Sequence, residues 1–416
     1  MRDFLIGRDT KDHDIATSAG PDELCRLFPN AVTVGKAFGV LKIPLSYSQS
    51  PHAQFLEIAT FREDLEYRDH RHPTGILFAG PTEDARRRDF TVNGLFYDAK
   101  SSRILDTVGG LDDIKAKTLR AIGDPKERFQ EDALRLLRAA RFTTTLGFTL
   151  DPATAKAAKA RAKLIDRVSS ERIRDELTLM LSGPRPADAL KLMSDLGFLG
   201  NVLPELERLQ GLKHPSLFHE GDVWRYTLQI VETLVRQTPQ RSAPLMWAAA
   251  LSKVGQHAAA KKSGGKNFNG HELEGGRLVK GVGERLKMPN VEIDQIRALV
   301  EEQLKFRDVF QMREATLQRF IRHPDFEMML ALHRADATVS DGNLAFYEFC
   351  KTRWEELRKK GPTDSKVLSG EDLIQLGLKP GPRFAEILRA VEDLALENRL
   401  TSKEEALEYV VKHFVR

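Results

Sequence analysis

The sequence predicts an α/β head followed by a long all-helical neck, body and tail, and three observations support this. Short β-rich runs, AVTVGKAFGVLKIPL (31–45) and FLEIATF (55–61), alternate with turn residues over about the first 110 positions. From about Leu119 onward, apolar residues recur at spacings of three and four, as in amphipathic helices. Helix breakers such as Gly183-Pro184 separate these stretches.

The composition is typical of a globular protein. The chain has 416 residues, of which 41% are hydrophobic and 30% charged, and this length predicts about two to four structural units. No apolar run approaches the roughly 20 residues of a membrane-spanning helix, and the first residues are too charged for a signal peptide. Cys25 and Cys350 are far apart, so neither a disulfide framework nor a cysteine-based zinc site is expected. We therefore expect a cytoplasmic protein.

Three carboxylates are candidate metal ligands. Asp12 and Asp14 are two positions apart in TKDHDIAT, so on a strand both point to one face. Adjacent carboxylates repel unless a divalent cation lies between them, and Mg²⁺ takes such oxygen ligands together with nucleotide phosphates. Glu57 interrupts an apolar run and, on a neighbouring strand, would complete a site for two metals. The alternatives are a turn for the aspartates and an outward-facing Glu57.

Basic residues cluster in the first 175 or so positions, although the net charge is only +4. A basic groove for a polyanion and a solvated surface explain this equally well. In ARRRDFTVNGLFYD (85–98) three arginines precede Asp89, which suggests guanidinium groups aimed at phosphates and held by a carboxylate. A basic surface turn is the alternative.

The segment ERFQEDALRLLRAARF (127–142) is predicted to be one helix with a spiral of polar groups. Those polar groups are spaced by three residues: Asp132, Arg135, Arg138 and Arg141. Arg135 offers a donor fork and Asp132 an acceptor, which together could read the edge of a base. Intrahelical ion pairing is the competing explanation.

Together, these segments resemble the class II tRNA nucleotidyltransferases (CCA-adding enzymes) and the bacterial poly(A) polymerases. The resemblance covers nearly the whole chain, and its main motifs occur in the family's order: RDFLIGRDTKDHDIAT with EIATFR, RRDFTVNG, LDTVGGLDDI, EDALRLLRAARF and SSERIRDEL. The resemblance implies a polymerase-β-like head with a mixed sheet and helices, followed by an all-α neck, body and tail. The implied divisions are a head (1–118), a neck (119–182), a body (183–345) and a tRNA-binding tail (346–416).

The resemblance also assigns roles to individual residues. It implies that Asp12 and Asp14 bind the metal and that Glu57 is the third carboxylate of the catalytic set. Asp132 and Arg135 would act as a protein template for the incoming base. The further nucleotide contacts that it implies are Arg2, Arg88, Arg138 and Arg141.

The function implied is Mg²⁺-dependent addition of C, C and A from CTP and ATP to the 3′ end of tRNA, without a nucleic-acid template. The stretch Gly35–Val40 resembles the CCA-adding form, and Arg62–Pro73 resembles a loop needed to add the terminal A. A poly(A) polymerase or an A-only enzyme of the same family remains the alternative.

Two departures from the family pattern are expected to matter. The chain starts at Met1-Arg2-Asp3 without the strand and Gly-Gly loop that usually precede this motif and would hold the triphosphate. We hypothesise that this start is internal; a non-catalytic RNA-binding protein is the alternative. The body resembles an HD-type phosphohydrolase domain in which His219 and His271 remain. Its other positions are altered to Tyr226, Ser252-Lys253 and Gln303, which predicts a relic kept as scaffold.

Overall fold

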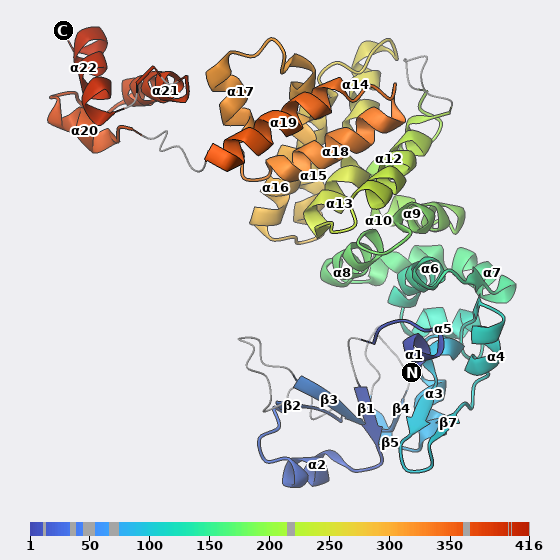
Figure 1. Ribbon diagram of the computed structural model, residues 1–416. Coiled ribbons are helices and arrows are strands. Elements are labelled where there is room, and N and C mark those ends of the chain that lie inside the picture. The colour runs from blue at the N-terminus through green and yellow to red at the C-terminus, as the bar shows by residue number, and fades with distance from the viewer. Residues whose placement is uncertain are drawn as a thin grey trace. The chain divides into compact units, whose positions relative to one another are not determined.

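The computed structural model (Figure 1) describes residues 1–10, 14–33, 39–44, 55–65, 75–213, 221–360, 367–397, 399–400 and 402–415. They form two compact units, the first comprising 1–207 with 285–287 and the second 208–284 with 288–416. The finer division into four parts stays a prediction. Among the described residues, no helix is both long and apolar enough to cross a membrane.

The first unit begins with a three-stranded mixed sheet. Its strands are β1 (Asp14–Thr17), β2 (Val40–Pro44) and β3 (Phe55–Thr60), in the order β1-β3-β2. β3 is parallel to β1 and antiparallel to β2. Leu41 and Ile58 are buried on one face together with Leu24 of α2 (Pro21–Leu27). Because side chains alternate along a strand, Glu57 and its register partners lie on the opposite face.

The rest of the head is built from short hairpins and helices. The hairpins pair β4 (Arg62–Asp64) with β5 (Ile76–Phe78) and β6 (Phe96–Asp98) with β7 (Arg103–Leu105). The helices are α1 (Arg2–Leu5), α3 (Pro81–Arg86), η2 (Thr91–Asn93) and α4 (Gly110–Lys115). The mixed head with helices that the sequence predicts is confirmed.

The LDTVGGLDDI segment forms a tight turn into α4. The Asp106 carboxylate accepts four backbone N–H groups, of residues 108 to 111, at 2.8–3.1 Å. Partial burial would raise the pKa of Asp106, but these four donors hold it below its ordinary value. Gly110 packs so closely that a Cβ there would lie 2.3 Å from the Thr91 carbonyl oxygen. The turn thereby joins α4 to η2.

The helices that follow are amphipathic, as predicted, but the predicted continuous helix over 127–142 is wrong. The chain leaves helical geometry at Asp132 (φ −141°, ψ 105°), and the Asp132 carboxylate accepts the Leu134 N–H at 3.1 Å. An aspartate that bonds the backbone in this way competes with the helix. The elements of this part are β8 (Thr118–Leu119), α5 (Pro125–Glu131), α6 (Leu134–Leu146), β9 (Thr149–Leu150), α7 (Pro152–Ala160), η3 (Ala162–Arg167), α8 (Ser170–Leu181), α9 (Pro186–Asp195), α10 (Leu199–Val202) and α11 (Pro204–Glu207).

The second unit is helical throughout its described part. Its larger portion comprises α12 (Val223–Gln237), α13 (Ala243–Leu251), α14 (Gly255–Ser263), α15 (His271–Arg285), α16 (Asn290–Glu301), η4 (Glu302–Asp308), α17 (Glu314–Ile321), α18 (Phe326–Val339) and α19 (Ala345–Lys360). The polar stretch 257–263 belongs to α14. Its alanines favour a helix, and Gly264 ends it in the left-handed conformation (φ 63°).

The last helices share a small core of their own. They are α20 (Gly370–Gln375), α21 (Pro382–Leu396) and α22 (Lys403–Phe414). Leu373, Ile387 and Val410 are fully buried between them. Gly381 precedes α21, and Pro382 is the first residue of that helix.

Candidate active site

Two of the three predicted metal ligands lie side by side in the head sheet. Asp14 on β1 is the register partner of Glu57 on β3, and neighbouring strands are about 4.8 Å apart. Both side chains are exposed and project from the face opposite Leu41 and Ile58. Asp12 lies outside the described residues. Within the described part of the chain, no group of three potential metal ligands is found.

Among the described residues, these two carboxylates have fewer cationic partners than the buried Asp84 and Asp89 of the same unit. Asp14 makes no hydrogen bond or ion pair with any described residue. Among the described residues, Glu57 has one ion pair, in which Lys42 Nζ lies 3.9 Å from Glu57 Oε2, and both side chains are nearly half-exposed. An exposed pair of this kind is weak. The oxygens therefore remain available to a hard cation, and this donor set fits Mg²⁺.

Asp84 organises the arginine-rich segment after α3. It is 2% exposed and accepts hydrogen bonds from Arg87 Nε at 2.8 Å and from Arg88 Nη2 at 3.0 Å. Arg88 also donates to the Asn93 carbonyl oxygen at 3.0 Å and covers the Phe96 ring at 4.4 Å. A carboxylate does hold these guanidinium groups, as the sequence suggested, but it is Asp84 that holds them. Asp89 points elsewhere.

Asp89 instead joins the head to α6. Its carboxylate accepts Arg138 Nε at 2.7 Å and Asn93 Nδ2 at 2.9 Å. Burial would raise the pKa of Asp89, but the Arg138 guanidinium and the Asn93 amide hold it below its ordinary value. Burial would correspondingly lower the pKa of Arg138, yet Asp89 and Glu176 raise it. Both groups are therefore charged at neutral pH.

Glu176 of α8 completes this network. It is 6% exposed and accepts Arg141 Nε at 2.6 Å and Arg138 Nη1 at 3.5 Å. The two guanidinium groups thus share one buried carboxylate, which fixes their direction along α6. Charge-assisted contacts of this kind are among the stronger hydrogen bonds in proteins.

Three guanidinium groups surround the Phe142 ring. Those of Arg141, Arg2 and Arg138 lie 4.2, 4.8 and 5.0 Å from its centroid. Arg2 also donates from Nη1 to Asn93 Oδ1 at 2.5 Å, so Asn93 links α1 to Asp89. Three cationic groups are thus held around one aromatic ring, an arrangement suited to a polyphosphate.

The two residues expected to read the base already have protein partners. Asp132 accepts both arms of the Arg172 guanidinium, at 3.1 and 2.7 Å. Arg135 is 7% exposed and donates to Glu131 at 2.6 Å and to the Arg87 carbonyl oxygen at 3.0 Å. The Glu131–Arg135 ion pair joins α5 to α6, so it differs from the intrahelical pairing that was the competing explanation.

Comparison with known proteins places this arrangement in a family. The family model "Poly A polymerase head domain" matches residues 1–120, and "Probable RNA and SrmB- binding site of polymerase A" matches 147–209. The CCA-adding enzyme of Bacillus licheniformis is 32% identical over 98% of this chain and 91% of its own. The chain belongs to the family of CCA-adding enzymes and bacterial poly(A) polymerases. It is a nucleotidyltransferase.

Other members of this family are similar over most of their length. The A-adding tRNA nucleotidyltransferase of Deinococcus radiodurans is 32% identical over 79% of this chain and 78% of its own. The crystal structure of the Bacillus stearothermophilus CCA-adding enzyme in complex with CTP matches with a TM-score of 0.70 and 25% identity, over 99% of this chain and 90% of that one. The predicted fold class and family are confirmed.

Sequence reasoning missed Asn93, Arg172 and Glu176 in this nucleotidyltransferase. Asn93 belongs to RRDFTVNG, and the other two belong to SSERIRDEL, so both motifs were recognised without these side chains being given a role. Only the folded structure brings them to Arg2, Asp132 and α6, as described above.

In the second unit, the altered HD-like positions do converge. Lys253 Nζ lies 3.0 Å from Asp336 Oδ1 and donates to Gln303 Oε1 at 3.2 Å. The Tyr226 hydroxyl donates to the same Asp336 oxygen. The Lys253 ammonium group, 4% exposed as a residue, thereby occupies the centre of this polar cluster. His219 lies outside the described residues.

Proposed function

We propose that this nucleotidyltransferase adds C, C and A from CTP and ATP to the 3′ end of tRNA, in the presence of Mg²⁺. The observation that carries the proposal is the Asp14–Glu57 pair, two neighbouring carboxylates with little or no neutralisation by the described protein groups. The full-length similarity to CCA-adding enzymes supports the choice of substrate.

In this reaction the tRNA 3′-hydroxyl attacks the α-phosphorus of the nucleoside triphosphate, a P–O bond to the leaving pyrophosphate breaks, and the hydroxyl proton is lost. Asp12, Asp14 and Glu57 would hold Mg²⁺, which favours the deprotonated hydroxyl and offsets charge on the pyrophosphate. The guanidinium groups of Arg2, Arg88, Arg138 and Arg141 would orient the triphosphate. Such positioning and charge stabilisation account for most of the catalysis of phosphoryl transfer.

Asp132 and Arg135 would select the incoming base. Asp132 offers acceptors but holds Arg172 with both of its oxygens, so a cytosine or adenine amino group would have to displace one arm of that guanidinium. A base that pairs with Arg135 must likewise replace a contact with Glu131 or with a backbone carbonyl. Base selection would then be an exchange of hydrogen bonds within a fixed frame.

A second candidate is an enzyme that adds only the terminal A, because the A-adding relative of Deinococcus radiodurans is as similar in identity as the CCA-adding relative. The segment Arg62–Pro73 resembles a loop needed to add A, so it is compatible with both CCA addition and addition of the terminal A alone. Residues 66–74 lie outside the described part, so this choice rests on experiment. A cytoplasmic location also stays a prediction.

One assay separates these functions. Purified protein with Mg²⁺ receives tRNA transcripts that lack CCA or lack only the final A, with CTP and ATP supplied singly and together. We expect CC from CTP alone and complete CCA from both nucleotides. Extension solely of the transcript that ends in CC would establish an A-adding enzyme, and long A tails would establish a poly(A) polymerase. Incorporation should stop when EDTA removes the metal.

A further inference from the structure

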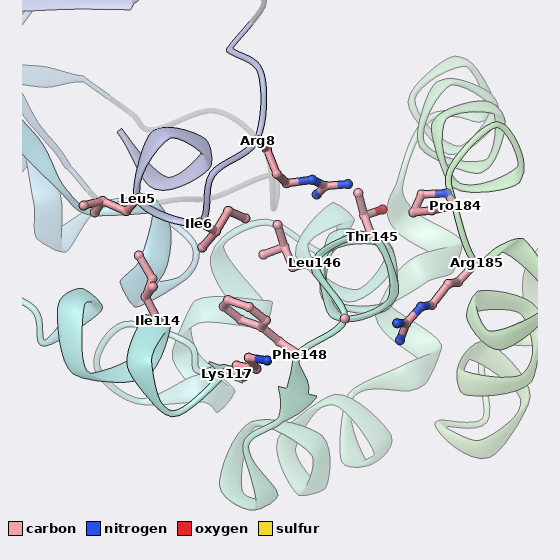
Figure 2. A pocket seen from close by; sticks show the side chains of 11 residues that line it. Leu5, Ile6, Arg8, Ile114, Lys117, Thr145, Leu146, Phe148, Pro184 and Arg185 are labelled. Carbon is pink, nitrogen blue, oxygen red and sulfur yellow. The ribbon is translucent and has the colours of Figure 1, made fainter.

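A basic cavity lies in the first unit, at the end of α6 remote from Asp132 and Arg135. Its volume is 530 Å³, and its apolar wall includes Ile6, Leu146 and Phe148. Arg8, Lys117 and Arg185 also line it, and none of the described lining residues is acidic. Figure 2 shows Arg8 and Arg185 approaching the Thr145–Gly147 end of α6 from different sides.

Each cation comes from a different connection of the chain. Arg8 follows α1, Lys117 lies between α4 and β8, and Arg185 precedes α9. Lys117 has a left-handed backbone (φ 51°), which is unfavourable for lysine, and its carbonyl oxygen accepts the Thr149 N–H at 2.8 Å. Strain of this kind concentrates at functional sites. The fold therefore holds Lys117 at the cavity at some cost in stability.

Arg185 is held against the end of α6. Its guanidinium covers Gly147, where a Cβ would lie 3.3 Å from Arg185 Nη1. Gly147 also needs its left-handed conformation (φ 70°) to end α6. The helix dipole explains one cation at the carboxyl end of a helix. It does not explain three cations around one cavity.

The three side chains have no compensating partner within the described part of the chain. None makes a hydrogen bond or ion pair with a described residue, whereas Arg138 and Arg141 are satisfied by Asp89 and Glu176. Grouped cations without a carboxylate repel one another and attract an anion. The apolar wall beside them suits a sugar more than water. A phosphate flanked by ribose has this chemistry.

We propose that this cavity binds a backbone phosphate of the RNA substrate. The assignment rests on the proposed function, which makes that RNA a tRNA. From Arg135 to the Leu146 end, α6 rises about 16 Å. A nucleoside triphosphate whose base lies at Asp132 and whose phosphates meet Arg138 and Arg141 is therefore not expected to extend to the cavity. A polynucleotide strand can contact both.

The test compares two variants with the same change in net charge. The cavity variant carries Arg8→Gln, Lys117→Asn and Arg185→Gln, where asparagine tolerates the left-handed backbone. The control carries Lys126→Gln, Lys156→Gln and Lys163→Gln, three exposed lysines of the same unit. The affinity for tRNA lacking CCA is measured against salt concentration, together with the KM values for tRNA and CTP and the melting temperature.

We expect the cavity variant to bind tRNA at least about tenfold more weakly, with a salt dependence whose slope falls by about one or more. Its KM for CTP should match that of the control, and its melting temperature should be no lower than that of the control. Equal tRNA affinity and salt slope in the two variants would overturn the proposal. So would a rise confined to the KM for CTP, which would show a site for free nucleotide. Because tRNA binding is measured without catalysis, a wild-type protein that binds tRNA but adds no nucleotide would refute the proposed function separately.

Discussion

Asp14 and Glu57 lie opposite each other on the parallel strands β1 and β3, and of the two only Glu57 has a described cationic neighbour, Lys42 at 3.9 Å. Two adjacent carboxylates raise each other's free energy unless a cation is present. The sheet therefore carries a local excess of negative charge on this face. A divalent metal would relieve it.

Asp14→Asn should reduce nucleotide incorporation by at least about 100-fold, because a metal ligand is worth several kcal/mol in the transition state. Binding of tRNA should remain nearly intact. Lys42→Gln, on the same face, is the matched control and should change the rate only slightly. Single-turnover incorporation at several Mg²⁺ concentrations measures this. An Asp14→Asn enzyme that loses tRNA affinity but keeps its rate would contradict a role in metal binding.

Glu176→Gln tests whether the buried carboxylate positions Arg138 and Arg141. Without its charge, the guanidinium groups lose charge-assisted contacts at 2.6 and 3.5 Å. The KM for CTP should rise about tenfold, which is about 1.4 kcal/mol, while the affinity for tRNA stays the same. Glu171→Gln is the control, since Glu171 lies on the same helix and pairs only with the exposed Lys287 among the described ion pairs. Equal effects of the two changes on the KM for CTP would show that Glu176 does not position Arg138 and Arg141.

Arg172→Gln should alter the choice between CTP and ATP. This change frees the Asp132 carboxylate and leaves Arg135 in place. An Arg135→Ala change would be a less clean test, because Arg135 is buried and bonded to backbone carbonyls, and its loss would also cost stability. The ratio of kcat/KM for CTP to that for ATP should shift by about tenfold, within the range for one base contact. Arg174→Gln, two residues further along α8, is the control. An unchanged ratio would remove Asp132 from base selection.

The sequence was sufficient to predict the position of a site residue where its charge stands out from the local apolar pattern. The glutamate in an apolar run predicted a strand position for Glu57 beside the Asp pair, and its register with Asp14 confirms that placement for Asp14. The long-range partners could not be predicted. Glu176 on α8 accepts a hydrogen bond from Arg141 on α6. Arg87 donates to Asp84 and not to Asp89. In both cases the packing of the helices determines which carboxylate lies nearest to the arginine.

The break at Asp132 shows a different limit of sequence reasoning. Periodic apolar residues continue through 127–142, so a single helix was expected. A single hydrogen bond from the Leu134 N–H to the Asp132 side chain competes with the helical pattern. The bidentate contact with Arg172 then stabilises the extended conformation. Local propensity could not decide between these states.

In the HD-like cluster, Lys253→Met should destabilise the protein by about 3–5 kcal/mol, because Asp336 would lose its cation while remaining largely buried. Burial alone would raise the pKa of Asp336, and Lys253 and the Tyr226 hydroxyl hold it below its ordinary value. The double variant Lys253→Met with Asp336→Asn should recover part of the loss. Urea unfolding measures all three proteins. A single change no worse than the double change would show that the ion pair contributes nothing.

His333 should make the second unit sensitive to acid. Its ring stacks on Phe306 with centroids 4.1 Å apart, and its Nε2 is buried without a hydrogen-bond partner. Burial lowers the pKa of His333 from its ordinary value of 6.5 to about 4. The unfolded chain therefore takes up a proton between pH 6.5 and about 4 that the folded chain does not, so stability falls as the pH falls through this window.

His333→Phe keeps the stacked ring and removes this titration. At pH 8 its melting temperature should be close to that of the unmodified protein. At pH 5 it should be higher, because protonation of the unfolded histidine costs the unmodified protein up to about 3 kcal/mol across the window. Asp336 does not obscure the comparison, since its pKa lies below its ordinary value and it stays ionised at pH 5. Parallel melting curves of the two proteins from pH 8 to 5 would show that His333 is protonated equally in the folded and unfolded states.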